Sequence, residues 1–108
     1  MLEYAEALAY QIAYEQRARA HLRVLAADER ARVLDGIERY LTHEAEVEPR
    51  NGRRKRMRPN SVAQGRLRLD PLRVYYDVAG ATVVVKAVGT KRRERVVAPT
   101  GEELLTNE

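Results

Sequence analysis

The hydrophobic pattern near the N-terminus changes from the spacing of a strand to the spacing of a helix. Between residues 9 and 14, tyrosine and isoleucine occupy every second position, and this alternation predicts a short strand. From Glu15 to Leu25 the apolar positions are separated by four and then three residues, with arginines between them, which is typical of an amphipathic helix. The apolar stripe of this helix consists of Ala18, Leu22 and Leu25.

A second amphipathic helix is expected directly after the first. Ala26-Ala27-Asp28 interrupts the pattern, and Asp28 has the side chain of a helix N-cap. Gly36 lies within the next apolar stripe and lowers helix stability without ending the helix. The members of this stripe are Val33, Leu34, Ile37, Tyr40 and Leu41. Two consecutive helices with one apolar face each predict a helical hairpin that covers a sheet.

The second half of the chain has the pattern of several short strands. Residues 43–61 are rich in charged and turn-forming residues, so we expect a long loop there. Strands are predicted at residues 64–69, 72–78, 82–88 and 95–98. The strand at 82–88 is apolar on both faces, which is typical of a central strand, and Gly89 is expected to end it.

These elements have the order β-α-α-β-β-β-β and predict an α+β fold, with a small, mostly antiparallel sheet and an N-terminal helical hairpin on one face. Residues 1–108 are expected to form a single domain. Residues 1–8 are interpreted as a loose leader and residues 99–108 as a polar C-terminal tail. Because no segment has the pattern of a signal peptide or a transmembrane helix, we expect a cytoplasmic protein with no membrane partner.

The distribution of charge along the chain indicates a candidate function. The net charge is +4, but the basic residues are concentrated in one segment. Residues 50–73 contain nine Arg or Lys and a single Asp, whereas residues 1–49 contain six Arg and ten Asp or Glu. A basic surface concentrated on a small domain is typical of a protein that binds a phosphate backbone. The alternative interpretation is a solvated charge run without a partner.

The arginines of the predicted hairpin are expected to share one face of the sheet. Arg66 and Arg68 occupy alternate strand positions, so their side chains point to one face of the sheet and those of Leu67 and Leu69 to the other. Basic clusters precede and follow this hairpin, and we expect the three groups to converge on one surface that binds RNA. The residues predicted to bind RNA there are Arg53, Arg54, Lys55, Arg56, Arg58, Arg66, Arg73 and Arg93.

Groups suited to acid–base or metal chemistry are few. The chain has no cysteine, and its histidines, His21 and His43, are expected away from the basic strands, in structural or solvated positions. We therefore expect neither a metal nor a cofactor. Cleavage of a phosphodiester by such a site would depend on cations that stabilise the charge of the transition state.

Two segments carry a more specific combined pattern. They read Arg66-Leu-Arg-Leu-Asp-Pro-Leu-Arg-Val-Tyr-Tyr-Asp-Val78 and Val83-Val-Val-Lys-Ala-Val-Gly-Thr-Lys-Arg-Arg-Glu-Arg95. The first fits the pattern L-R-x-x-x-x-R-V-x-Y, and the second contains V-G-x-[KR]-R. Together they resemble the RelE/ParE family of type II toxins, in its RelE-like branch. The resemblance covers about residues 9–98 and implies the element order given above.

The resemblance also implies a function and a set of roles. RelE-like toxins are ribosome-dependent mRNA endoribonucleases that inhibit translation and are neutralised by a cognate antitoxin in a toxin–antitoxin hetero-oligomer. Arg68 would contact the scissile phosphate together with Lys91 or Arg92, and Lys55 and Arg56 would hold the mRNA backbone. In the best-known members a tyrosine of the C-terminal strand helps to activate the 2′-hydroxyl, whereas the corresponding segment here reads Arg95-Val-Val-Ala98.

The absent tyrosine leaves two alternatives to an endoribonuclease. ParE-like members are expected to have the same fold, act on DNA gyrase and do not cut RNA. A third interpretation is a non-catalytic module that binds RNA or DNA. All toxin interpretations imply an antitoxin partner with acidic residues that cover the basic surface.

Overall fold

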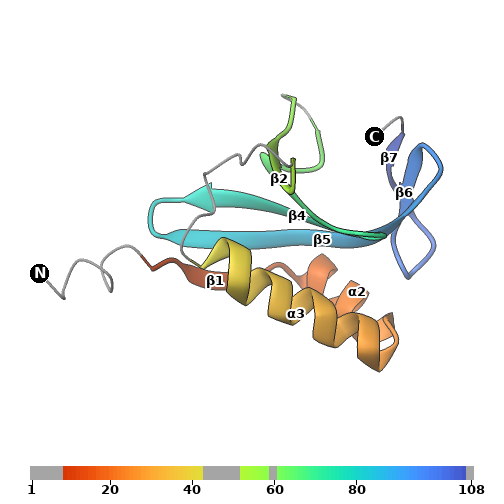
Figure 1. Ribbon diagram of the computed structural model, residues 1–108, viewed down its shortest axis with the longest axis horizontal. Helices are drawn as coiled ribbons and strands as arrows, with labels where there is room; N and C mark the ends of the chain where they lie inside the picture. Colours follow the sequence, from red (N-terminus) through yellow and green to blue (C-terminus); the bar gives the residue numbers. More distant parts are fainter. Residues whose placement is uncertain (1–8, 43–51, 59–60, 107–108) are drawn as a thin grey trace, which may run out of the picture.

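A computed structural model describes residues 9–42, 52–58 and 61–106 of the chain. Two helices and a mostly antiparallel sheet form a compact α+β fold (Figure 1). The elements are β1 (Gln11–Tyr14), α2 (Gln16–Val24), α3 (Ala27–Leu41), β2 (Arg54–Arg56), β3 (Gly65–Leu69), β4 (Leu72–Ala79), β5 (Thr82–Arg92), β6 (Arg95–Val97) and β7 (Glu103–Thr106). None of the described helices is long and apolar enough to cross a membrane.

Strand β5 organises the sheet, as its apolar sequence predicts. The strand order is β2-β3-β4-β5-β6-β7, and all of these neighbours are antiparallel. Strand β1 pairs in parallel with the first part of β5, at residues 82–85, while β6 pairs with its last part, at residues 90–92. Strand β5 therefore has a neighbour along both edges for much of its length.

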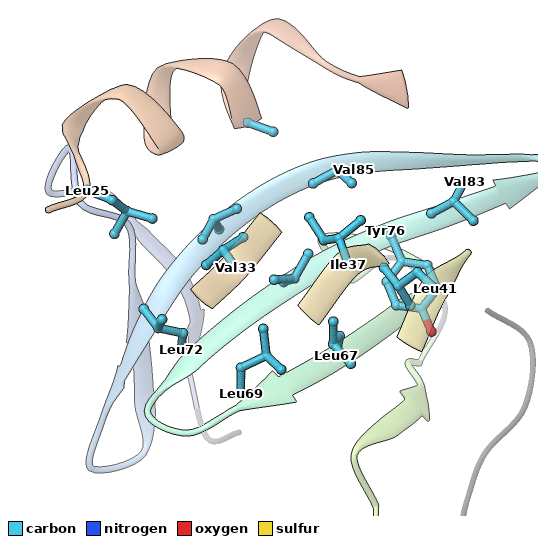
Figure 2. Close-up of a cluster of buried hydrophobic side chains, with 13 residues drawn as sticks. Leu25, Val33, Ile37, Leu41, Leu67, Leu69, Leu72, Tyr76, Val83 and Val85 are labelled. Carbon is cyan, nitrogen blue, oxygen red and sulfur yellow. The ribbon is translucent and has the colours of Figure 1, made fainter. Parts of the chain in front are cut away.

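The main core lies between the two helices and one face of the sheet, which we call the helix face (Figure 2). Helix α3 contributes Val33, Ile37 and Leu41, all at most 2 % exposed, and Ala18 and Leu25 of α2 are also buried. Complete burial of a Val, Leu or Ile side chain contributes about 1.5–3 kcal/mol. The predicted strand at residues 9–14 and the two predicted helices are confirmed.

A smaller core lies on the opposite face, which we call the open face. It consists of Ala63, Tyr75, Ala87 and Val96, and partly buried side chains of residues 57, 62, 104 and 105 pack against it. The hairpin of β6 and β7 and the segment before β3 therefore cover part of this face.

Three predictions about strands and loops were wrong in part. The predicted loop at residues 43–61 contains β2, because Arg54 pairs with Leu67 and its side chain is buried near Tyr40. Strand β5 continues past Gly89, since β4 and β6 pair with it beyond that residue. The predicted polar tail contains β7, whose two leucines pack on the smaller core.

Two predictions about the second helix also require correction. Asp28 is not the N-cap, because α3 begins at Ala27 and Asp28 lies in its first turn, where its charge suits the helix dipole. Leu34 is 42 % exposed and is not part of the core stripe. The predictions for residues 1–8 and for His43 lie outside the described residues.

Candidate nucleic-acid interface

The pairing of β2, β3, β4 and β5 places five cations on the open face. Arg66 lies opposite both Lys55 and Tyr75, and Arg68 lies opposite Arg73. Directly paired residues of antiparallel strands point to the same side of the sheet. Arg73 in turn pairs with Gly89 of β5, and Lys91 follows two positions later on the same side. The expected convergence on one face therefore holds for Lys55, Arg66, Arg68, Arg73 and Lys91.

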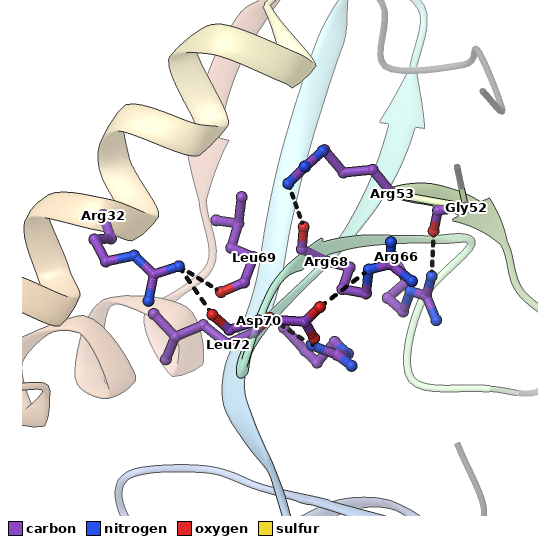
Figure 3. Close-up of polar contacts among 9 residues, drawn as sticks. Arg32, Gly52, Arg53, Arg66, Arg68, Leu69, Asp70 and Leu72 are labelled. Carbon is purple, nitrogen blue, oxygen red and sulfur yellow. Dashed lines mark hydrogen bonds and ion pairs between the residues drawn. The ribbon is translucent and has the colours of Figure 1, made fainter. Parts of the chain in front are cut away.

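The Asp70 carboxylate forms ion pairs with Arg68 of β3 and Arg73 of β4 (Figure 3). Its Oδ1 atom accepts a hydrogen bond from Nη1 of Arg73 at 2.9 Å, and its Oδ2 atom is 3.5 Å from Nε of Arg68. The backbone N–H of Lys91 donates to the carbonyl oxygen of Pro71 at 2.8 Å, which brings β5 to the β3–β4 turn. Desolvation raises the pKa of Asp70, but Arg73, Arg68 and Lys91 together hold it below its ordinary value.

The five cations differ in their access to solvent. Arg66 is 9 % exposed and donates through Nη2 to the carbonyl oxygen of Gly52 at 2.5 Å, while Arg73 is 3 % exposed and also donates to the carbonyl oxygen of Leu72. The side chain of Arg68 is 34 % exposed, Lys91 is partly exposed and Lys55 is exposed. Lys55, Arg68 and Lys91 are therefore the cations of the open face that a ligand can reach.

Arg92 and Arg54 of the predicted site point to the other side of the sheet. Arg92 is one position beyond Lys91 in β5, so it has the opposite orientation. Arg54 pairs with Leu67 of the main core, and it donates to the carbonyl oxygen of Tyr40 at 3.4 Å. Lys91 therefore lies on the same face as Arg68, and Arg92 does not.

The other predicted cations lie outside this group of five. Arg56 is two positions after Arg54 in β2 and therefore has the same orientation, away from the open face, and Arg58 is exposed just after the strand. Arg93 is exposed in the turn between β5 and β6, where it has a positive φ of 60°. Arg53 precedes β2 and points toward α3, with its guanidinium carbon 4.7 Å from the centre of the Tyr40 ring.

A cleft between α3 and the end of β3 contains residues that the sequence analysis did not assign to a site. Its volume is about 350 Å³, and its cationic lining comprises Arg32, Arg39, Arg53 and Arg68. Arg32, Asp35 or Gly36, and Arg39 are spaced by three or four positions along α3 and therefore form one stripe. This stripe lies next to the apolar stripe of α3. The spacing of Arg32 and Arg39 in the sequence was the signal that could have identified them as neighbours on one side of the helix.

Two side chains that could transfer a proton, those of Tyr75 and His21, are buried. Tyr75 shares the open face with Arg66 but is completely buried in the smaller core. His21 is 1 % exposed on α2, where Nδ1 accepts from the backbone N–H of Val88 and Nε2 lies 2.6 Å from Oε1 of Glu102. Among the described residues, no group of three or more His, Asp or Glu side chains could hold a metal ion.

The arrangement is suited to binding an anion. Arg68 and Lys91 come from separate strands, and both lower the pKa of the Asp70 carboxyl. A guanidinium and an ammonium group near one anion can replace the counterions of a phosphate and stabilise added negative charge on it. A scan against protein-family models and a search of curated proteins found no match to this chain.

Proposed function

We propose that the protein is the toxin of a type II toxin–antitoxin system of the RelE/ParE kind and acts as a ribosome-dependent mRNA endoribonuclease that inhibits translation. The observation that carries the proposal is the position of Arg68 and Lys91. These cations come from β3 and β5, share the open face and both act on the Asp70 carboxylate. In the RNA-bound state a phosphate would take the place that this carboxylate occupies among them.

The proposed reaction needs positive charge beside the phosphate, which arginine and lysine side chains can supply. The 2′-oxygen of the RNA forms a bond to the adjacent phosphorus, and the bond from phosphorus to the 5′-oxygen breaks. The 2′-hydroxyl loses its proton to water and the leaving oxygen gains one from water, so the products are a 2′,3′-cyclic phosphate and a 5′-hydroxyl. Arg68 and Lys91 would stabilise the charge on phosphorus-bound oxygens, and Lys55 would position the strand.

The fold supports the same proposal. The first elements are a strand and two helices, and five of the remaining strands pair antiparallel in sequence order from β2 to β6. The resemblance to RelE/ParE toxins implies four strands after the helices, and β3 to β6 correspond to them, whereas β2 and β7 are additional. A toxin of this kind would act in the cytoplasm and would have an antitoxin partner whose acidic residues cover Lys55, Arg68 and Lys91.

Purified protein and programmed ribosomes test this function directly. Wild-type protein should cleave the ribosome-bound mRNA and leave 2′,3′-cyclic phosphate ends, and Arg68→Ala should reduce the rate about 100-fold or more. Arg19→Ala, which removes an exposed arginine of α2, should retain the wild-type rate. Intact mRNA at high protein concentration would contradict the proposal.

The absence of a tyrosine from β6 leaves no proton-transfer group on that strand and favours a second candidate. Tyr75 is buried, and Val96 occupies the buried position of β6 opposite Lys91. A non-nuclease toxin of the same fold that inhibits DNA gyrase would need no such group. Loss of gyrase supercoiling on addition of protein, with mRNA left intact, would establish this alternative. If neither activity is found and salt-dependent binding remains, the protein is a non-catalytic nucleic-acid-binding module.

A further inference from the structure

The cleft between α3 and β3 begins where the pairing of β2 with β3 ends. Strand β2 covers the edge of β3 as far as the pair Arg54–Leu67. Beyond it, the backbone N–H of Arg68 donates to the carbonyl oxygen of Arg53, and Nη1 of Arg53 donates to the carbonyl oxygen of Arg68 at 3.1 Å. Arg32 reaches the same edge from α3 and donates to the carbonyl oxygens of Leu69 and Asp70, at 2.9 and 3.0 Å (Figure 3). The floor and walls of the cleft are thus fixed by hydrogen bonds.

Cations surround an aromatic ring inside this cleft. The guanidinium carbon of Arg53 is 4.7 Å from the centre of the Tyr40 ring, and that of Arg39 is 5.9 Å away. The guanidinium carbon of Arg54 is also 5.9 Å from the centre of this ring. Positive charge gathered around one ring is favourable for each cation and the ring, but unfavourable between the cations. An anion placed between them would relieve that repulsion.

The charges and the size of the cleft indicate what it can bind. Four arginines line it against two carboxylates, Asp35 and Asp70, which leaves it positive. A volume of about 350 Å³ is at the lower end of the range for small-ligand sites and fits one nucleotide rather than a folded segment. Arginine planes and a tyrosine ring are the surfaces on which bases stack in single-stranded RNA recognition.

We propose that this cleft is a subsite for one nucleotide of the bound RNA strand, adjacent to the phosphate held by Arg68. Arg68 is the link, because it belongs to the open face and also lines the cleft. The RNA strand would run from Lys91 past Arg68 and over the edge of β3. There the next base would stack beside Arg53 and Tyr40, and Arg39 would contact the phosphate of that nucleotide. The inference rests on the proposed function, since a nucleotide subsite serves a protein that binds RNA. The binding of a single nucleotide can nevertheless be measured without ribosomes or mRNA.

Adenosine 5′-monophosphate is the probe, with inorganic phosphate and adenosine as its two halves. In an NMR titration of the 15N-labelled full chain, the monophosphate should shift amides of α3 and β3 around the cleft and bind more tightly than either half. Arg39→Ala should weaken this binding about tenfold. Arg39 is exposed and is not part of the hydrophobic core, so its truncation leaves the core intact. Arg19→Ala, an exposed arginine of α2, is the matched control and should bind as wild type does.

Two results would overturn the inference. One is the absence of shifts around the cleft, and the other is equal binding by wild type and Arg39→Ala. A failure of the proposed function has a different signature: wild type would leave ribosome-bound mRNA intact while the monophosphate still binds in an Arg39-dependent manner. Conversely, mRNA cleavage that depends on Arg68 and not on Arg39 would keep the function and reject the subsite.

Discussion

His21 and Glu102 are 81 residues apart in sequence, yet Nε2 of His21 lies 2.6 Å from Oε1 of Glu102. The other ring nitrogen, Nδ1, accepts from the backbone N–H of Val88 at 3.1 Å. On that edge of β5, strand β1 pairs only with residues 82–85 and β6 only with residues 90–92. His21 therefore fills the gap between two strands, and because Nδ1 is an acceptor, Nε2 carries the proton donated to Glu102.

This contact predicts a pH-dependent contribution to stability. The hydrogen bond from His21, and then those from Arg17, lower the pKa of Glu102 below its ordinary value of 4.5. A carboxyl with a lower pKa in the folded state stabilises the protein above its unfolded pKa and loses that contribution as the pH falls through the folded pKa. Urea unfolding should show Glu102→Gln to be less stable than wild type at pH 7, with the difference shrinking below about pH 4.5.

Glu103→Gln provides the control for this effect. Glu103 is the next residue, is exposed, and accepts hydrogen bonds from Arg95 and Thr106 of the same hairpin. Its difference from wild type should be smaller at pH 7. A difference between wild type and Glu102→Gln that stays constant from pH 7 to pH 3 would show that the charge of Glu102 does not stabilise the fold.

A second prediction concerns Gly36, which permits the close approach of α3 to β3. A Cβ atom at this position would lie 2.5 Å from Cδ1 and 2.8 Å from Cδ2 of Leu69. Gly36→Ala should gain about 1 kcal/mol of helix propensity but lose about 1–3 kcal/mol through overpacking, so the net effect is destabilising. Chemical denaturation of Gly36→Ala, Leu69→Ala and the double variant measures it.

The double variant separates these two effects. With Leu69 shortened, the added methyl group has room, and Gly36→Ala should become neutral or stabilising relative to Leu69→Ala alone. Equal costs of Gly36→Ala in the two backgrounds would mean that Leu69 is not the residue that requires glycine at this position.

The alternation of polar and apolar residues predicts which face of the sheet a side chain points to, but it does not predict how deeply that side chain is buried. Alternation correctly placed Arg66 and Arg68 on the face opposite Leu67 and Leu69. It could not show that Arg66 is buried, because the carbonyl oxygen that holds it belongs to Gly52, in a segment interpreted as part of a loop. The burial of an arginine depends on an acceptor brought from elsewhere in the chain, and a single-strand pattern contains no information about that partner.

Strand ends were a second difficulty, for a related reason. Gly89 looks like a strand terminus, but a Cβ there would lie 2.8 Å from Val96 and 2.9 Å from Leu104, so glycine allows the C-terminal hairpin to pack closely. Leu104 and Leu105 are adjacent and do not alternate, and both pack against the smaller core. Strand β7 is therefore specified by its pairing with β6 rather than by its own period.

The position of Asp70 predicts that it competes with the ligand of the open face. Asp70→Asn removes a negative charge from among Arg68, Arg73 and Lys91, while its side-chain oxygen can still accept from Arg73. The variant should bind single-stranded RNA about threefold more tightly or better at 50–100 mM salt, as measured by fluorescence anisotropy. Asp28→Asn removes an exposed carboxylate at the start of α3 and should leave the affinity unchanged. Weaker binding by Asp70→Asn would assign the carboxylate a direct role in holding RNA.

The orientation of Lys91 and Arg92 gives the last prediction. They are neighbours in β5, yet Lys91 lies on the open face with Arg68, and Arg92 points to the opposite side. Each phosphate contact with a single strand contributes about 0.7 to the slope of log affinity against log salt concentration. Lys91→Ala should therefore reduce that slope by about 0.7 and weaken RNA binding at low salt, whereas Arg92→Ala should change neither quantity beyond the effect of net charge.

Because both variants lose one positive charge from adjacent residues, they control for each other. The long-range effect of net charge is the same for the two, so a difference in slope reports a contact and not the general attraction of a basic protein for RNA. Thermal unfolding of both variants should first show equal stability. A larger loss of slope for Arg92→Ala would mean that RNA follows the turn between β5 and β6 on the helix side, and the open face would no longer be the binding surface.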